Sequence, residues 1–137
     1  MPLKIDNNSE LLEARASLFG GDLPSAWLLL NYVGDSTVHL AAGNDSDAES
    51  LEYHLKDDEV QYALLRLSTA SGVRDVFVSW VGPGVGIVEK GKRLAFVSDA
   101  QALLRPYQSS ITASSRSRFT TANVLAASEP GGSGTIS

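Results

Sequence analysis

Few side chains in this sequence have the type and spacing that catalysis or metal binding requires. There is no cysteine, and neither of the two histidines, His39 and His54, has a partner at metal-ligand spacing. None of the serines lies in a Gly-x-Ser-x-Gly nucleophile turn. We therefore expect no catalytic residue, no metal and no cofactor, and we interpret the chain as a binding module and not an enzyme. An enzyme with unrecognised serine, histidine or carboxylate chemistry stays open as an alternative.

Two short segments resemble ligand sites only in their composition. The run Gly82–Gly86 lacks the Gly-Lys-Ser/Thr ending of a phosphate-binding loop. The acidic run Asp57–Glu59 leads into a predicted strand, where adjacent side chains point in divergent directions. The glycine run is better explained as a plain connecting loop, and the acidic run as a solvated loop.

Composition predicts a single soluble domain. The chain has 137 residues, 43% of them hydrophobic, which is enough for one core without disulfides. Met1–Asn8 lacks the charged-then-apolar run of a secretory signal, and apolar runs such as Trp27–Leu30 are too short to span a bilayer. We expect a cytoplasmic protein without a membrane partner.

Charge is unevenly distributed along the chain. The net charge of -5 argues against nucleic acid as a partner, because phosphate binding needs a basic surface. Residues 1–68 sum to -8, whereas residues 69–137 sum to +3. The basic second half could steer the protein toward an acidic partner, or it could be an ordinary solvated surface.

Hydrophobic spacing predicts an alternation of helices and strands separated by turn residues. Ser46 and Glu49 have the spacing of a capping box for a short helix, and Trp27 and Trp80 are expected in the core. The elements predicted before residue 82 are a helix from Asp6 to about Phe19, a strand over Ala26–Val33, a strand over Thr37–Ala42, a short helix buried through Ala48, Leu51 and Leu55, a strand over Val60–Thr69 and a strand over Val73–Val81.

The second half is predicted to contain one long helix over Val88–Arg105. Its indicator is the helical spacing of Phe96, Ala100, Leu103 and Tyr107, and Pro106 should kink or end it. The remaining expected elements are a strand over Ser109–Ala113, a helix over Ser115–Ala127 and a disordered tail from Glu129.

This order of elements predicts an α+β fold. Short turns join the first four strands, which suits antiparallel pairing, and the long helix before the fifth strand suits parallel pairing. We expect a five-stranded mixed sheet, four strands antiparallel and one parallel, flanked on both faces by helices. The domain should cover residues 1–128, with residues 129–137 as the disordered tail.

Several segments in sequence order resemble one known family. They are Lys4-Ile5-Asp6, Tyr32-Val33-Gly34-Asp35-Ser36, Lys56-Asp57-Asp58-Glu59-Val60, Tyr62-Ala63-Leu64-Leu65-Arg66 and Val76-Phe77-Val78-Ser79-Trp80-Val81-Gly82. The last of these resembles the fourth strand and the Trp-x-Gly ending of the actin-depolymerising-factor homology family, which is similar to this chain over about residues 4–127. Within that family the chain resembles the coactosin branch.

The resemblance implies a monomeric, cytoskeletal protein that binds actin, filaments in preference to monomers. Lys90 and Lys92 match the family's basic pair at the start of the long helix, and Arg74 lies where coactosins carry a lysine tied to filament binding. Leu94 or Val97 would supply apolar contact. Arg93 lies one position further along the same helix. Three weaker candidates are assigned by charge and expected proximity only: Arg105, Arg116 and Arg118. For every one of these cations the alternative is a solubilising surface charge.

A second reading of the same resemblance keeps the fold and changes the partner. Some members of the superfamily bind actin-related proteins or serve as adaptors instead of binding actin. A non-actin adaptor is therefore the alternative function.

Overall fold

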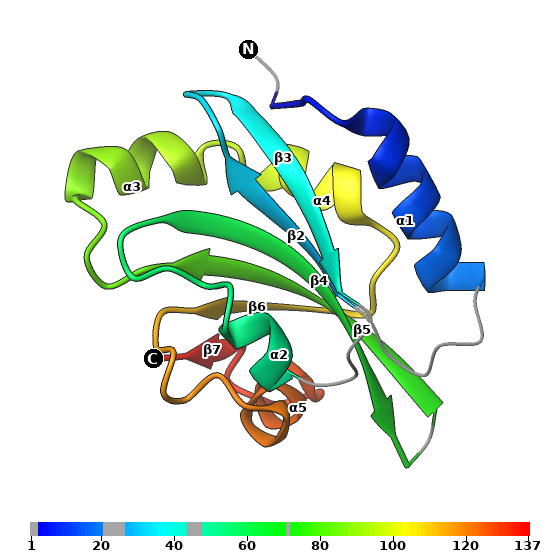
Figure 1. Ribbon diagram of the computed structural model, residues 1–137. Coiled ribbons are helices and arrows are strands. Elements are labelled where there is room, and N and C mark those ends of the chain that lie inside the picture. The colour runs from blue at the N-terminus through cyan, green and yellow to red at the C-terminus, as the bar shows by residue number, and fades with distance from the viewer. Residues whose placement is uncertain (1–2, 21–26, 44–47, 71) are drawn as a thin grey trace.

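The computed structural model describes residues 3–20, 27–43, 48–70 and 72–137, and Figure 1 shows the arrangement of its helices and strands. In chain order the elements are β1 (Lys4–Ile5), α1 (Asn8–Gly20), β2 (Trp27–Tyr32), β3 (Thr37–Gly43), α2 (Ala48–Glu52), β4 (Val60–Thr69), β5 (Gly72–Val81), α3 (Ile87–Leu94), α4 (Val97–Leu104), β6 (Ser109–Ala113), α5 (Thr121–Ser128) and β7 (Thr135–Ile136).

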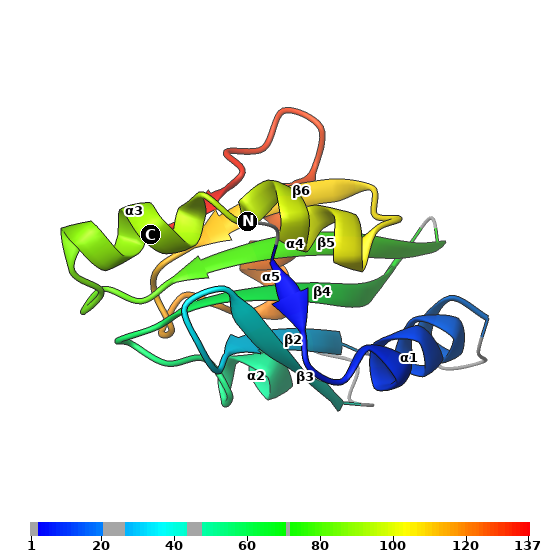
Figure 2. The same cartoon turned by 90° about the horizontal axis from the view of Figure 1, so that it is seen from above.

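One mixed, twisted sheet forms the centre of the molecule (Figure 2). Its strand order is β1-β3-β2-β4-β5-β6-β7. The pairs β2–β3, β2–β4 and β4–β5 are antiparallel, and β6 runs parallel to β5, so the predicted mixed α+β class is confirmed.

The predicted strand number is wrong, because the described residues form seven strands and not five. The two additional strands, β1 and β7, lie at the sheet edges, parallel to β3 and β6. Each has only two residues, too few to produce the alternation by which a strand is recognised in a sequence.

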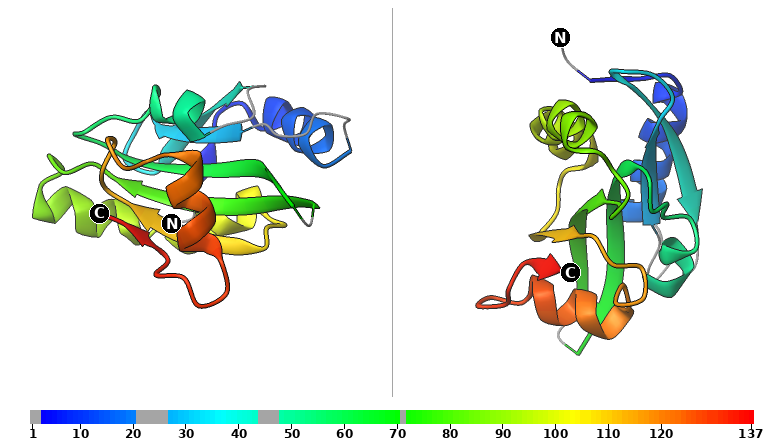
Figure 3. Two further views of the ribbon diagram at one scale, coloured as in Figure 1. Left: turned by 90° about the horizontal axis from the view of Figure 1, so that it is seen from below. Right: turned by 90° about the vertical axis from the view of Figure 1, so that its left-hand side faces the viewer.

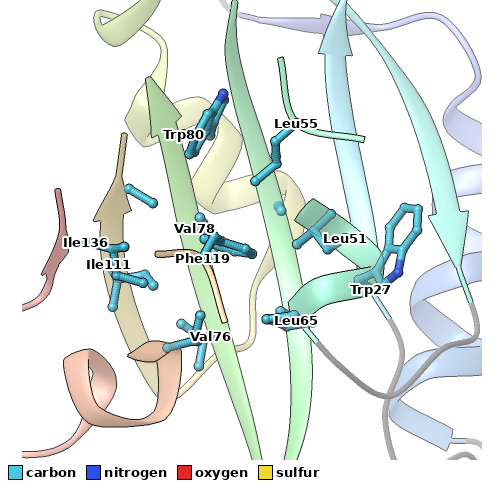
Figure 4. Packing of buried hydrophobic residues seen from close by; sticks show 14 of the residues in the cluster. Trp27, Leu51, Leu55, Leu65, Val76, Val78, Trp80, Ile111, Phe119 and Ile136 are labelled. Carbon is cyan, nitrogen blue, oxygen red and sulfur yellow. The ribbon is translucent and has the colours of Figure 1, made fainter. Parts of the chain in front are cut away.

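Both faces of the sheet are covered by helices, as predicted. On one face Leu65, Val78 and Trp80 pack with residues of α2 and α5, a cluster shown in Figure 4. On the other face Tyr62 and Phe77 pack with residues of α1 and α4. Neighbouring residues of a strand point to opposite faces, so β4 and β5 are buried on both sides. Trp27 and Trp80 are core residues, with exposed fractions of 3% and 0%.

The predicted long helix is wrong as a single element, because it is broken between α3 and α4. In a continuous helix the Arg93 carbonyl would accept a hydrogen bond from residue 97. It accepts instead from the Phe96 N–H at 3.0 Å and from the Tyr62 hydroxyl at 2.6 Å. The helical spacing that predicted the helix describes α4, which buries Ala100 and Leu104, whereas α3 buries none of its residues.

The chain end also differs from the prediction. The last helix begins at Thr121, capped by the Thr120 hydroxyl, so residues 115–120 precede the helix. The predicted tail forms β7, in which Ile136 is only 5% exposed. Gly131 and Gly134 have φ values of 84° and 69°, which glycine tolerates, and their turn brings the chain back to β6.

Candidate binding surface

The first turns of α3 project from the end of the sheet and are exposed on all sides (Figure 1). Ile87 and Val88 are 90% and 72% exposed. Lys90 and Lys92 are exposed beside them, and no side chain or backbone group of the described residues pairs with either ammonium. Two apolar and two basic side chains are thus presented to solvent on one short helix.

The segment before α3 is held in place by its contacts with the loop before β4. Trp80 Nε1 donates to the Lys56 carbonyl at 2.7 Å, and the Gly84 N–H donates to the Asp57 carbonyl at 2.7 Å. A Cβ atom at Gly82 would lie 2.2 Å from the Asp57 carbonyl oxygen, so only glycine fits there. The Gly82–Gly86 run is a connecting loop, as predicted. Its contacts fix the position at which α3 begins.

The end of α3 is attached to the sheet by Arg93. Its Nη1 donates to the carbonyls of Gly34 and Asp35, at 2.8 Å each, in the turn between β2 and β3. Its guanidinium lies 4.1 Å from the centre of the Tyr32 ring and pairs with Glu89 at 3.3 Å. The side chain is only 17% exposed, so its surroundings differ from those of Lys90 and Lys92.

Two tyrosine hydroxyls lie under the same point of α3. Tyr32 and Tyr62 are hydrogen-bonded at 2.8 Å, and both hydroxyls reach the Arg93 carbonyl. Burial raises the pKa of Tyr62 well above its ordinary range, and the hydrogen bond between Tyr62 and Tyr32 acts in the same direction. Burial also raises the pKa of Tyr32. Both rings therefore stay neutral, and each has one proton to donate.

A groove of about 620 Å³ separates α3 from the turn between β2 and β3. Val88 and Phe96 provide its apolar lining, and Lys92 is a basic lining residue. The remaining lining residues are Asp35, Ser36, Glu89 and Arg93.

Ile87 and Val88 are the apolar residues that sequence reasoning missed. The predicted contacts Leu94 and Val97 are partly buried against the core instead. Ile87 lies seven residues before Leu94 and therefore on the same helix face. Sequence spacing cannot show which of these two residues is exposed and which is partly buried. Only the projection of α3 beyond the sheet exposes the earlier residue.

The other predicted cations do not join this surface. Arg74 lies at the start of β5, about 23 Å of strand before Val81. Its guanidinium donates to the Leu125 carbonyl at 3.0 Å and to the Ser128 hydroxyl at 3.2 Å, both in α5. Figures 1 and 3 show α5 well apart from α3. Arg74 therefore holds α5 to the sheet.

Three arginines lie elsewhere. Arg116 pairs with Glu52 at 3.1 Å, on the α2 side of the sheet. Arg118 is exposed and lines a hollow of about 340 Å³ between α5 and the chain end. Arg105 is exposed just after α4. The structure thus brings together Lys90, Lys92 and Arg93 from the predicted set, and separates the others from them.

The described ranges contain neither a cluster of metal ligands nor a membrane-spanning helix. No three or more His, Cys, Asp or Glu side chains there lie close enough together to hold a metal ion. None of the helices in those ranges is long and apolar enough to cross a membrane.

Comparison with known proteins identifies the family. A family model described as cofilin/tropomyosin-type actin-binding protein matches residues 4–128. No curated protein sequence matches the chain.

Solved structures share the fold at low sequence identity. Human coactosin-like protein has a TM-score of 0.76 at 17% identity, covering 89% of this chain and 94% of its own. Streptomyces griseoflavus cofilin has a TM-score of 0.74 at 16% identity, covering 90% and 94%. Mouse coactosin, described as an actin filament binding protein, has a TM-score of 0.68 at 17% identity, covering 90% and 88%.

Proposed function

The chain belongs to the cofilin/tropomyosin-type actin-binding family, and from this premise we propose that it binds actin filaments through the exposed side chains of α3. The observation that carries the proposal is the exposed set on α3: Lys90 and Lys92 without partners among the described residues, beside Ile87 and Val88. The preference for filaments is supported by the shared fold with mouse coactosin.

The two kinds of side chain would contribute differently. Exposed lysines speed the approach to an acidic surface and orient the complex, but their interaction is screened by salt. Burying Ile87 and Val88 against the partner would supply most of the affinity, at roughly 25 cal/mol per Å² of apolar surface before the cost of association is subtracted.

Arg118 is a cation of the predicted set that lies on a different surface from α3. It is exposed beside α5, whereas Arg74 and Arg116 already have partners within the chain. We assign the contact to α3 because both lysines and both apolar residues lie together there. A substitution of Arg118 therefore tests whether the contact lies on α3 or beside α5.

Co-sedimentation with actin filaments tests the proposal. The wild-type chain should pellet with filaments at low salt and less at high salt. Lys90→Ala with Lys92→Ala should weaken binding about tenfold and flatten the salt dependence, because two exposed charges are removed. Ile87→Ser with Val88→Ser should weaken binding at both salt concentrations.

Arg118→Ala is the matched control, since it removes one exposed charge beside α5. It should pellet like wild type. Loss of pelleting in Arg118→Ala alone, with the lysine variant unaffected, would move the contact to α5. No pelleting of folded wild type at low salt would contradict filament binding and favour another protein partner for this fold.

A further inference from the structure

Arg93 is the one basic residue of α3 whose charge is turned into the protein. Its guanidinium contacts the carbonyls of Gly34 and Asp35 and the face of the Tyr32 ring. Glu89, one helical turn earlier, pairs with it at 3.3 Å. A partner that approached α3 would meet Lys90 and Lys92 before it met this side chain.

We propose that Arg93 is a positioning residue: it fixes α3 to the turn between β2 and β3 so that Lys90 and Lys92 face the partner, and it does not itself bind actin. The proposal rests on the proposed function of α3. Its positive charge suggests that Arg93 contacts actin directly, whereas the proposal assigns it the role of positioning α3.

Packing alone gives α3 little attachment. The helix has no buried residue, and Leu94 at its end is only partly buried against the core. An exposed helix of eight residues is too short to be stable in isolation, so its position must come from tertiary contacts. Arg93 supplies hydrogen bonds to the rest of the protein from a helix that has no buried side chain.

Arg93 is attached at both ends. Its carbonyl accepts from the Tyr62 hydroxyl at 2.6 Å, and its side chain reaches the turn after β2 at 2.8 Å. Tyr32 contributes to both attachments, through its hydroxyl and through its ring face. One residue therefore joins α3 to β2, β4 and the turn, and the direction of the helix depends on it.

The chemistry of this attachment requires arginine. The guanidinium donates to both carbonyls through Nη1 and pairs with Glu89 through Nη2 while it lies over the Tyr32 ring. A lysine has a single nitrogen and no planar group, so it cannot reproduce these contacts together. Arg93→Lys therefore retains the charge and loses the geometry. If Arg93 bound actin by charge, that variant would keep most of the affinity.

Two measurements on Arg93→Lys and Arg93→Met test the proposal. Hydrogen exchange of the α3 amides in the free protein should rise about tenfold or more in both variants, while the urea midpoint of the whole protein changes little. Filament affinity should fall about fivefold or more in both variants, with a salt dependence like that of wild type.

Lys92→Ala is the control for a direct contact. It should leave hydrogen exchange of α3 unchanged and reduce the salt dependence of binding. Wild-type affinity and exchange in Arg93→Lys would overturn the positioning role. Wild-type exchange in both Arg93 variants would overturn it even if affinity fell, because α3 would then be held without Arg93. Failure of wild type to pellet would overturn the proposed function instead, and the exchange measurement would still decide whether Arg93 holds α3.

Discussion

At the residue scale, the Glu49 carboxylate joins α2 to the start of α5. It accepts hydrogen bonds from the Thr121 N–H at 2.9 Å and from the Thr121 hydroxyl at 2.8 Å. The hydrogen bond from the backbone N–H lowers the pKa of Glu49 below its ordinary value of 4.5. The sequence predicted a capping box between Glu49 and Ser46, but Ser46 lies outside the described residues. The contact with Thr121, 72 residues away, has no sequence signal.

Glu49→Gln should lower the free energy of unfolding near neutral pH. A carboxylate whose pKa is lowered by folding stabilises the folded state above its unfolded pKa. That stabilisation is lost as the pH falls through the lower folded pKa. The difference between wild type and Glu49→Gln should therefore be constant above about pH 5 and shrink below about pH 4.5. Urea denaturation across this range measures it.

Glu129→Gln controls for the loss of one negative charge, because Glu129 is exposed at the other end of α5. The difference in free energy of unfolding between Glu129→Gln and wild type should not show the pH dependence expected for Glu49→Gln. A Glu49→Gln difference that stays constant down to about pH 3 would contradict the assigned hydrogen bonds.

At the element scale, contacts between the segment before α3 and the loop before β4 position the start of α3. The Gly82 N–H donates to the Glu59 carbonyl at 3.0 Å, and the Gly84 N–H donates to the Asp57 carbonyl at 2.7 Å. The backbones approach closely because neither glycine has a side chain. The acidic run that the sequence predicted to be a solvated loop thus supports the chain that leads into α3.

Gly82→Ala should lower the free energy of unfolding by about 1–3 kcal/mol, because its Cβ would overlap the backbone of Asp57. Gly91→Ala is the opposite case: nothing lies within 4 Å of a Cβ there, inside α3. It should stabilise the protein by up to about 1 kcal/mol through helix propensity. Urea denaturation of both variants measures the change in the free energy of unfolding, which should be negative for Gly82→Ala and positive for Gly91→Ala. Equal changes in the two variants would contradict the close packing at Gly82.

At the scale of the whole molecule, the chain end completes the sheet. The Ser114 N–H donates to the Ile136 carbonyl and the Thr112 N–H to the Gly134 carbonyl, both at 2.9 Å. The Ile136 side chain packs in the same core cluster as Val124 and Phe119 (Figure 4). These contacts join the segment to the sheet and the core, although its glycine and serine content suggests a tail.

Ile136→Ala should lower the free energy of unfolding by about 1–3 kcal/mol, since it removes buried methyl and methylene groups from the core. Thr135→Ala, on the neighbouring exposed position of β7, should change it by less than about 0.5 kcal/mol. Thermal or urea unfolding compares the two. Equal and negligible effects would show that β7 does not contribute to the folded domain.

Local patterns in the sequence determined the central part of this protein. The alternation in β4 and β5, the turn between β2 and β3, and the apolar surroundings of Trp80 are each encoded within a few neighbouring residues. They correctly predict the antiparallel strands. The helical segment before β6 correctly predicts its parallel pairing, although that segment forms two helices and not one. The ordered segments around Val76–Gly82 were enough to indicate the family, which the match over residues 4–128 confirms.

Tertiary structure alone decided the rest. The break after α3 depends on the Tyr62 hydroxyl meeting a carbonyl 31 residues away. The roles of Arg74 and Arg93 depend on carbonyls 51 and 59 residues distant. Period and propensity record what a residue shares with its neighbours in the chain. They contain no information about which distant backbone group will accept its hydrogen bonds. A cation whose hydrogen bond is accepted by such a group stabilises the fold, whereas a cation without such a partner stays exposed on the surface.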